Sequence, residues 1–174
     1  NKEVSGSMAD ELAKVFTEVV VAPSFTQEAI SKLTEKKNIR IIEAHPPGFP
    51  LLDMRSLDGG LLVQTCDRLQ LDHSQWTIAT DREPTESEWI DLDFAWRVAA
   101  KVSSNCIVLA KDKQALGIGA GQQNRRDAGV IAAEKANGRA KGGVCASDAF
   151  FPFTDGLDAA IDAGCTAVIQ PGGS

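Results

Sequence analysis

The chain has 174 residues, 43% of them hydrophobic, and a formal net charge of −6 at pH 7. This length and composition support a hydrophobic core without disulfides, and the acidic balance argues against nucleic acid as a partner. No apolar stretch approaches the roughly 18 residues of a membrane-spanning helix, and we expect no signal peptide. The sequence therefore predicts a cytoplasmic protein with no membrane partner.

Cysteine and histidine usage predicts neither disulfides nor a bound metal. The four cysteines form no CxxC pair, which is typical of reduced cytosolic thiols. They are Cys66, Cys106, Cys145 and Cys165. The two histidines, His45 and His73, lack the spacing of metal ligands. We therefore expect no metal site.

The first 45 residues predict a β-α-β arrangement. A helical pattern over 7–16 precedes a short apolar strand over 18–22, which Pro23 ends. Thr26 is placed to cap a helix over 27–36, and 39–42 is the next strand. This order implies that the two strands pair in parallel. Because the chain opens on Asn1 without an initiator Met, we expect a fragment of a longer protein.

Residues 46–84 predict a connecting region. The run from His45 to Pro50 is rich in proline and marks a linker. Short strands are expected at 61–64 and 76–79, with a turn at Gly59-Gly60. Arg55 and Gln64 could be site groups, but exposed strand positions are the favoured interpretation.

From residue 85 the pattern predicts alternating helices and strands. Thr85 and Glu88 form a capping box. Helices are expected over 86–103, 125–137 and 156–163, with Asp155 as the N-cap of the last. Strands are expected over 106–110, 115–121, 142–146 and 166–169.

The glycines of Gly117-Ile118-Gly119-Ala120-Gly121 suggest a dinucleotide-binding loop only weakly. The fingerprint needs a glycine at its sixth position, where this chain has Gln122, and an acid about twenty residues later. Close packing of the strand is the simpler interpretation, and a dinucleotide-dependent oxidoreductase is the weakest functional hypothesis.

Arg125 and Arg126 stand at the predicted start of a helix. Free N–H groups at a helix start favour anions, whereas the helix dipole disfavours arginine there. The arginines are therefore interpreted either as a solvated first turn or as cations that a ligand or partner compensates.

Two further features border the same predicted strands. Asn105 precedes a buried strand, where it could cap a helix end or offer a donor and an acceptor to a planar ligand. Phe150, Phe151 and Phe153 fall in a strand-to-helix loop, where ligands of open α/β sheets bind. They could be core residues or a stacking surface for a flat ligand.

Several of these stretches, taken together, resemble one family. Ser104-Asn105, GIGAGQQNR, SDAFFPFTD and AVIQPGGS follow in this order, and EVVVAPSF and KKNIRIIE precede them. In this series they resemble the AICAR transformylase/IMP cyclohydrolase family, in its transformylase part. The resemblance covers nearly the whole chain.

The resemblance implies an α/β fold of cytidine-deaminase-like, three-layer α/β/α subdomains with a mixed sheet and no zinc. It places the end of a first subdomain at 1–45, a connecting region at 46–84 and a second subdomain at 85–174. The implied reaction, in purine (IMP) biosynthesis, transfers a formyl group from 10-formyltetrahydrofolate to phosphoribosylaminoimidazolecarboxamide (AICAR). The full-length protein would also carry IMP cyclohydrolase and form a homodimer with shared sites.

The resemblance also implies roles for individual residues. Asn105, Arg125 and Phe150 match positions that bind AICAR. Arg126, Asp155 and Ser174 match positions that bind the folate. At the position of Arg126, however, other members of the family carry an apolar residue. The family's catalytic Lys-His pair has no counterpart in this chain, because Ala44 precedes His45 and Asp72 precedes His73. We therefore expect no catalytic residue and no formyl transfer by the chain alone.

Two main hypotheses follow from the sequence. The first is that the chain is a fragment of a formyltransferase. The alternative is a short non-catalytic module that binds a folate or a nucleotide and lacks the catalytic base.

Overall fold

The computed structural model describes residues 2–45, 48, 50–69 and 71–172 of the chain, which is a mixed α/β protein. The chain divides into two compact units, Asn1–Asp67 and Arg68–Ser174. None of the helices in the described ranges is long and apolar enough to cross a membrane.

The first unit contains a two-stranded parallel sheet, as predicted. Strand β1 (Val19–Ala22) pairs with β2 (Arg40–Glu43) in parallel, and helix α2 (Gln27–Leu33) connects them. Helix α1 (Gly6–Ala13) precedes β1. The helices and the sheet share a small apolar core whose buried members are Val4, Ala9, Val20, Ala22, Ala29 and Leu33.

Side-chain caps set the starts of both helices. The Ser5 hydroxyl accepts a hydrogen bond from Met8 N at 3.3 Å at the start of α1. Thr26 caps α2 as predicted, because its Oγ1 accepts a hydrogen bond from Ala29 N at 3.2 Å. Each cap satisfies one N–H group that has no partner within its own helix.

A β-hairpin follows in the same unit. Strand β3 (Leu52–Leu57) pairs antiparallel with β4 (Gly60–Thr65), and Gly59 takes φ +78 in the turn between them. The predicted Gly59-Gly60 turn is confirmed. No described residue from 50 to 69 is buried.

The strand predicted over 76–79 is wrong. These residues belong to no strand and follow the short 3₁₀ helix His73–Gln75. The ring of Trp76 lies 4.3 Å from that of His73 and 5.9 Å from that of Trp89, measured between centroids. An apolar tetrapeptide has strand propensity, but without a partner strand its aromatic side chain packs on a helix instead.

The second unit is built on a four-stranded mixed sheet in the order β6-β5-β7-β8. Strand β5 (Ile107–Lys111) is antiparallel to β6 (Gln114–Gly119) and to β7 (Val144–Ser147). Strand β8 (Ala167–Ile169) is parallel to β7.

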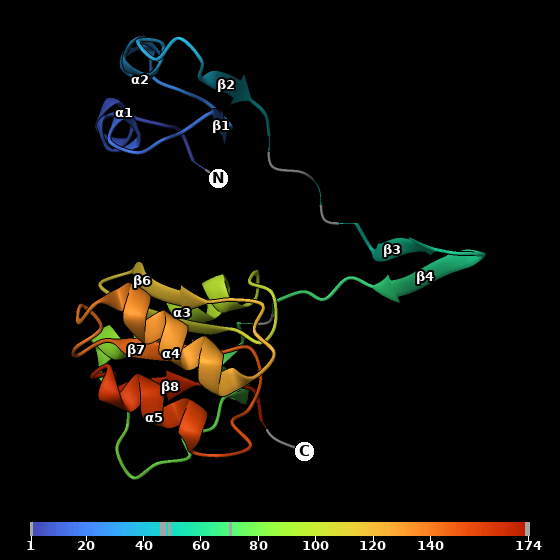
Figure 1. Cartoon of the computed structure of the whole chain (residues 1–174), viewed down its shortest axis with the longest axis vertical. Helices are drawn as coiled ribbons and strands as arrows, with labels where there is room; N and C mark the ends of the chain where they lie inside the picture. Colours follow the sequence, from blue (N-terminus) through green and yellow to red (C-terminus); the bar gives the residue numbers. More distant parts are fainter. Residues whose placement is uncertain (1, 46–47, 49, 70, 173–174) are drawn as a thin grey trace. The chain divides into compact units, whose positions relative to one another are not determined.

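Helices cover both faces of this sheet (Figure 1). Helix α3 (Glu86–Ala99) packs on one face, whereas α4 (Arg125–Ala136) and α5 (Asp155–Asp162) pack on the other. Residues 107–110 are therefore fully buried, which explains their uninterrupted apolar sequence. Helix α3 ends four residues before the predicted position 103, where the chain turns toward β5.

Close packing explains two of the glycines in β6. A Cβ added to Gly117 would lie 1.9 Å from the backbone oxygen of Ala132, and one added to Gly119 would lie 1.9 Å from that of Ala128. The backbone of α4 therefore approaches β6 closely. The prediction that these glycines permit close packing is confirmed. The element that packs against them is helix α4.

A buried carboxylate on α3 holds the turn between β5 and β6. Asp91 accepts hydrogen bonds from Asp112 N at 2.9 Å and from Lys113 N at 2.8 Å. Asp112 and Lys113 take φ +52 and +56, the conformation of a type I′ turn. Sequence analysis missed this contact, because the two partners are some twenty residues apart.

We predict that Asp91→Ala lowers the free energy of unfolding by roughly 2 kcal/mol, because it removes the acceptor of two backbone N–H groups. Urea denaturation of the variant measures this loss. Asp93→Ala on the same helix is the control, since it removes only surface contacts to His73 and Arg97 and should cost less than about 1 kcal/mol. Equal losses in the two variants would contradict the role of Asp91.

Glu88 joins the start of α3 to the start of β8. It completes the predicted capping box, because its carboxylate accepts a hydrogen bond from Thr85 N at 2.8 Å. The same carboxylate accepts hydrogen bonds from Arg82 at 2.9 and 3.1 Å and from the Thr166 hydroxyl at 2.5 Å. The hydrogen bonds from Arg82, above all, lower the pKa of Glu88 from 4.5 to about 2.

We predict a pH-dependent contribution of Glu88 to stability. Because its pKa is lower in the folded chain, its contribution is complete above pH 4.5 and is lost as the pH falls toward about 2. The difference in unfolding free energy between the wild type and Glu88→Gln should therefore shrink over this range. A difference that stays constant from pH 6 to pH 3, in urea titrations, would refute the assignment.

Candidate functional site

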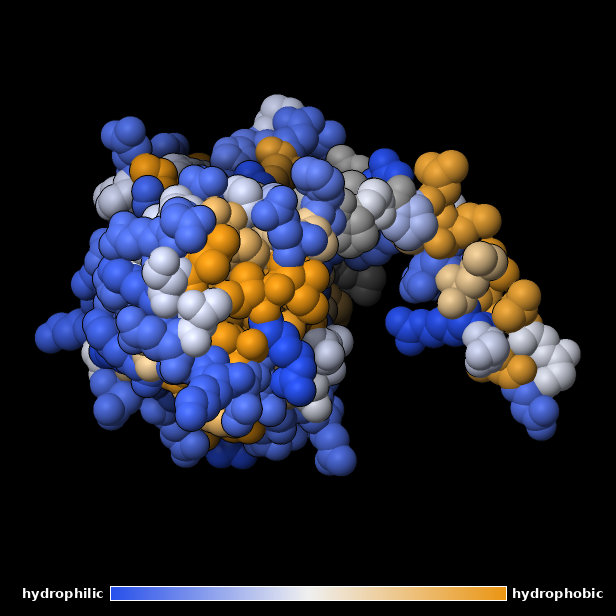
Figure 2. Space-filling view, turned by 90° about the horizontal axis from the view of Figure 1, so that it is seen from above, coloured by the Kyte–Doolittle hydropathy of each residue, from blue (hydrophilic) through white to orange (hydrophobic). Residues whose placement is uncertain are grey.

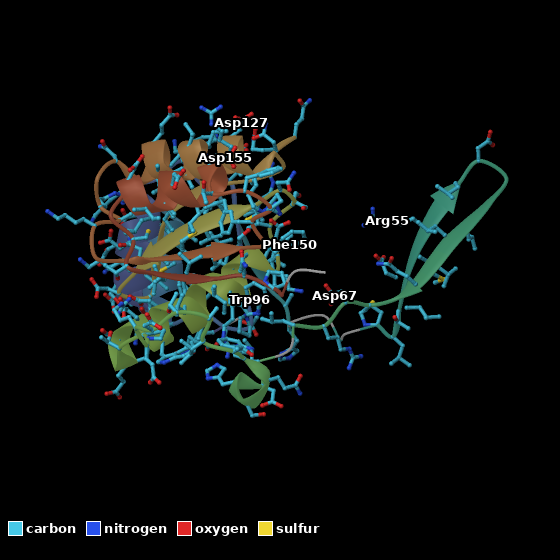
Figure 3. The ribbon with its side chains drawn as sticks, turned by 90° about the horizontal axis from the view of Figure 1, so that it is seen from below. Arg55, Asp67, Trp96, Asp127, Phe150 and Asp155 are labelled. Carbon is cyan, nitrogen blue, oxygen red and sulfur yellow. The ribbon has the colours of Figure 1, made fainter. Side chains whose placement is uncertain are left out.

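A hollow of about 500 Å³ opens at the edge of the sheet where β7 ends and where α4 and α5 begin. It lies within the second unit. In Figure 3, Asp127 and Asp155 lie close together, near the starts of these two helices. The residues that line the hollow are Asn105, Gln123, Asn124, Arg125, Arg126, Asp127, Phe151, Pro152, Phe153, Asp155 and Gly156.

Arg125 is the central polar residue of this edge. Its Nη1 donates to Asn105 Oδ1 at 2.7 Å, its Nε to Ser147 Oγ at 2.9 Å and its Nη2 to Asp148 Oδ1 at 3.1 Å. The side chains of Arg125 and Asp148 are only 10% and 15% exposed. Sequence analysis left open what compensates an arginine at a helix start, and the structure identifies Asp148 as one partner.

Asp148 and Ser147 are fixed by further contacts. Asp148 Oδ1 also accepts a hydrogen bond from Cys106 N at 2.7 Å, so that it bridges the residue before β5 and the Arg125 guanidinium. The Ser147 hydroxyl donates to Ala149 O at 2.6 Å and accepts from Arg125. Neither residue was among those that sequence analysis expected at the site. The only feature of the sequence that could have indicated them is their position next to the loop of three phenylalanines.

Asn105 is partly engaged by the chain itself. Its Oδ1 accepts from Arg125, and its Nδ2 donates to Gln122 O at 2.9 Å. One amide N–H of Asn105 and two N–H groups of Arg125 remain for another molecule, given the donors of each side chain. The pair therefore presents mainly donors, and it suits a ligand atom that accepts hydrogen bonds.

The three phenylalanines do not form one surface. Phe151 packs against the core beside α4 and α5, and its backbone N donates to Gln170 Oε1 at 2.8 Å. Phe153 is 76% exposed and lines the hollow, whereas Phe150 is 38% exposed and is not among the lining residues. The core interpretation holds for Phe151, which is partly buried against the core, whereas the stacking role of the cluster stays a prediction.

The first turns of α4 and α5 set the charge of the hollow. Asn124 caps α4, because its Oδ1 accepts from Asp127 N at 2.8 Å. Arg126 is exposed, and among the described residues no carboxylate lies within 4.0 Å of its guanidinium nitrogens. Asp155 is the first residue of α5 and not its N-cap, which is Thr154. Its Oδ1 accepts from Gly156 N at 2.8 Å, as an acid at a helix start can.

The remaining expectation at this site, Ser174, lies outside the described residues. Within the ranges that the structure describes, no cluster of three His, Cys, Asp or Glu side chains could hold a metal ion. Cys106 lies beside the site, but burial, above all, and the nearby Asp148 raise the pKa of its thiol to about 12. The thiol is therefore protonated near neutral pH and is a poor nucleophile.

A second, smaller hollow of about 350 Å³ lies on α3, away from these residues. It is lined by His73, Trp89, Ile90, Asp93, Phe94, Arg97 and Lys113. His73 Nε2 lies 3.0 Å from Asp93 Oδ1, and Arg97 donates to the other Asp93 oxygen at 3.1 Å. Sequence analysis missed this surface cluster, in which Trp89 also packs against the core of the second unit.

Comparison with known proteins identifies the family of the chain. Residues 1–135 match the family model described as AICARFT/IMPCHase bienzyme. The chain belongs to this family. The resemblance that the sequence motifs indicated is thereby confirmed.

Relatives within the AICARFT/IMPCHase family match over the whole chain. A protein of Anoxybacillus flavithermus called bifunctional purine biosynthesis protein PurH is 51% identical over 178 residues. Proteins of the same name from Bacillus cereus and Listeria monocytogenes are 49% and 47% identical. In each comparison all of this chain is covered, but the chain spans only 34% of the relative's length.

We predict that the two neighbouring arginines contribute very differently to stability. Arg125→Ala breaks a buried ion pair and leaves Asp148 without its cation, which should lower the free energy of unfolding by roughly 3 kcal/mol. Arg126→Ala removes an exposed side chain and should change it by less than about 0.5 kcal/mol. Urea titration of both variants tests this, and a loss in Arg126→Ala as large as that in Arg125→Ala would contradict it.

Proposed function

We propose that this chain supplies part of an AICAR formyltransferase, which transfers a formyl group from 10-formyltetrahydrofolate to AICAR in purine biosynthesis. Membership of the AICARFT/IMPCHase family supports this, as do the relatives' names, which assign them a bifunctional role in purine biosynthesis. Such a protein is an enzyme that also carries IMP cyclohydrolase, and it would work in the cytoplasm without nucleic acid or membrane as a partner.

The observation that carries the proposal is the joint position of the expected residues. Four of the six expected residues, Asn105, Arg125, Arg126 and Asp155, come from three segments of the chain, yet all four line the same hollow. We assign Asn105, Arg125 and Phe150 to AICAR. The donors that Asn105 and Arg125 retain suit an acceptor oxygen such as that of a carboxamide, and the accessible Phe150 ring offers a stacking face.

Arg126, Asp155 and Ser174 are assigned to the folate cosubstrate. Arg126 gives the mouth of the hollow an exposed cation, which suits the carboxylates of a folate. Asp155 instead brings a negative charge and acceptor oxygens, which suit N–H donors of a flat heterocycle. Arg126 therefore suits the carboxylate end of a folate, and Asp155 suits its heterocyclic end.

The fold proposed for the complete protein is cytidine-deaminase-like. The helix–sheet–helix layering of β5–β8 with α3, α4 and α5 supports a second such subdomain over 85–174, with 1–45 as the end of the first and 46–84 as the connection. We further propose a homodimer with sites shared between subunits, as the family resemblance implies.

The proposal is tested by titrating the isotopically labelled chain with AICAR and recording amide shifts by NMR, which detects weak binding. Shifts should concentrate at Asn105, in 122–127 and in 150–156, and Asn105→Ala should abolish them. Adenosine monophosphate, which lacks the carboxamide, serves as the control. Formyl transfer by the chain alone should be undetectable.

Two results would overturn the proposal. The first is that millimolar AICAR leaves these amide shifts unchanged while circular dichroism shows an intact fold. The second is that AICAR and adenosine monophosphate produce the same shifts at the same concentrations, which would indicate a general nucleotide-binding module instead.

A further inference from the structure

The second hollow, here called the α3 hollow, has an apolar wall and charged groups around it. Five of its seven lining residues, from Trp89 to Arg97, belong to α3. At about 100° per residue they fall within an arc of about 140°, so that they share one face of the helix. Its volume of about 350 Å³ lies at the lower end of the roughly 300–1,000 Å³ that is typical of small-molecule sites.

The aromatic wall of the α3 hollow is held in place by the protein itself. The ring of His73 is stacked on that of Trp89, with their centroids 6.0 Å apart and their planes 24° apart. Trp89 and Phe94 also pack against the core of the second unit. His73 Nε2 lies 3.0 Å from Asp93 Oδ1, which orients the imidazole ring. The wall therefore offers a preformed surface to which a flat ring can be added.

Two cations border this wall. Arg97 Nε donates to Asp93 Oδ2 at 3.1 Å, which leaves the Nη groups of Arg97 for another molecule. Among the described residues no carboxylate lies within 4.0 Å of Lys113 Nζ. The backbone of Lys113 is fixed next to α3, because its N–H donates to Asp91 Oδ1 at 2.8 Å. The hollow therefore has a surplus of positive charge, although the whole chain has a net charge of −6.

We propose that the α3 hollow binds a flat aromatic anion, such as an aromatic carboxylate. The ring would lie against Trp89 and His73, and the carboxylate would accept hydrogen bonds from Arg97 and Lys113. None of the residues assigned above to AICAR or to the folate lines this hollow. The inference is therefore independent of the proposed function and adds a second binding site to the chain.

The combination of wall and cations selects this class of ligand. A neutral apolar molecule would leave both cations without a partner, and a small inorganic anion would leave the wall exposed. Exposed apolar side chains also lie along the β3–β4 hairpin, which is drawn at the right of Figure 2. The α3 hollow differs from that surface because its apolar wall and its charged groups line the same concave site.

The experiment is an NMR titration of the isotopically labelled 174-residue chain with sodium benzoate at pH 7. The chain has three tryptophans, and their indole N–H signals are assigned by replacing each with Phe. The Trp89 signal should shift with a Kd on the order of millimolar, which is ordinary for so small a ligand. The Trp96 signal is the internal control, because Trp96 is on α3 but does not line the hollow.

Two other small molecules separate the contributions of ring and charge. Benzamide has the same ring and shape as benzoate but no charge, and it should bind about tenfold more weakly. Sodium acetate has the charge but no ring, and it should shift the Trp89 signal no more than sodium chloride does at the same ionic strength.

A pair of lysine variants tests where the anion binds. Lys113→Gln should raise the Kd of benzoate about threefold, since it removes one exposed cation from the hollow. Lys101→Gln removes the same charge from an exposed position that does not line the hollow, and it should leave this Kd unchanged. Neither variant should change the Kd of benzamide.

Four results would each overturn the proposal. They are no shift of the Trp89 signal in about 50 mM benzoate, equal affinity for benzoate and benzamide, equal effects of the two lysine variants, and shifts confined to 122–127 and 150–156. The last result would place the anion at the hollow beside Arg125. AICAR is not used in this experiment, so that the α3 site can fail while the proposed function stands, and the reverse.

Discussion

The buried ion pair between Arg125 and Asp148 is the interaction on which the candidate site depends. It joins the start of α4 to the loop after β7, and through Asn105 it reaches the segment before β5. A charge this far from water needs a partner, since an unpaired buried ion costs several kcal/mol. The three segments are therefore held at one edge of the sheet, and the hollow between them has a fixed arrangement of donors.

This network also shapes the chemistry that the hollow can perform. Arg125 and Asn105 use part of their hydrogen-bonding capacity on each other, and what they retain is almost entirely donor. The nearest thiol, Cys106, is held protonated by burial and by Asp148. Arg125 and Asn105 can therefore bind and orient a polar planar molecule that accepts hydrogen bonds.

The two units of the chain contrast in how they use apolar residues. The sheet of the second unit is covered by helices on both faces, and residues 107–110 of β5 and all of β7 are buried. Half of the residues in the two hairpin strands of the first unit are hydrophobic, yet none of them is buried, and β4 lacks the charges that β3 carries. The strand propensity of the sequence and the glycine turn at 59–60 favour this hairpin. Its apolar side chains would be stabilised by burial only if another surface covered them.

Much of the fold follows from local sequence. Periodicity, the caps at Thr26 and Thr85, and the glycine turn at 59–60 determined where most helices and strands lie, because these depend on neighbouring residues. Motif order determined the family. Only the tertiary structure decided which side chains meet: Asp148 with Arg125, Asp91 with the turn after β5, and Trp76 with Trp89 in place of the strand expected at 76–79. Such contacts join segments far apart in the chain, and their energies depend on burial and geometry that no local pattern contains.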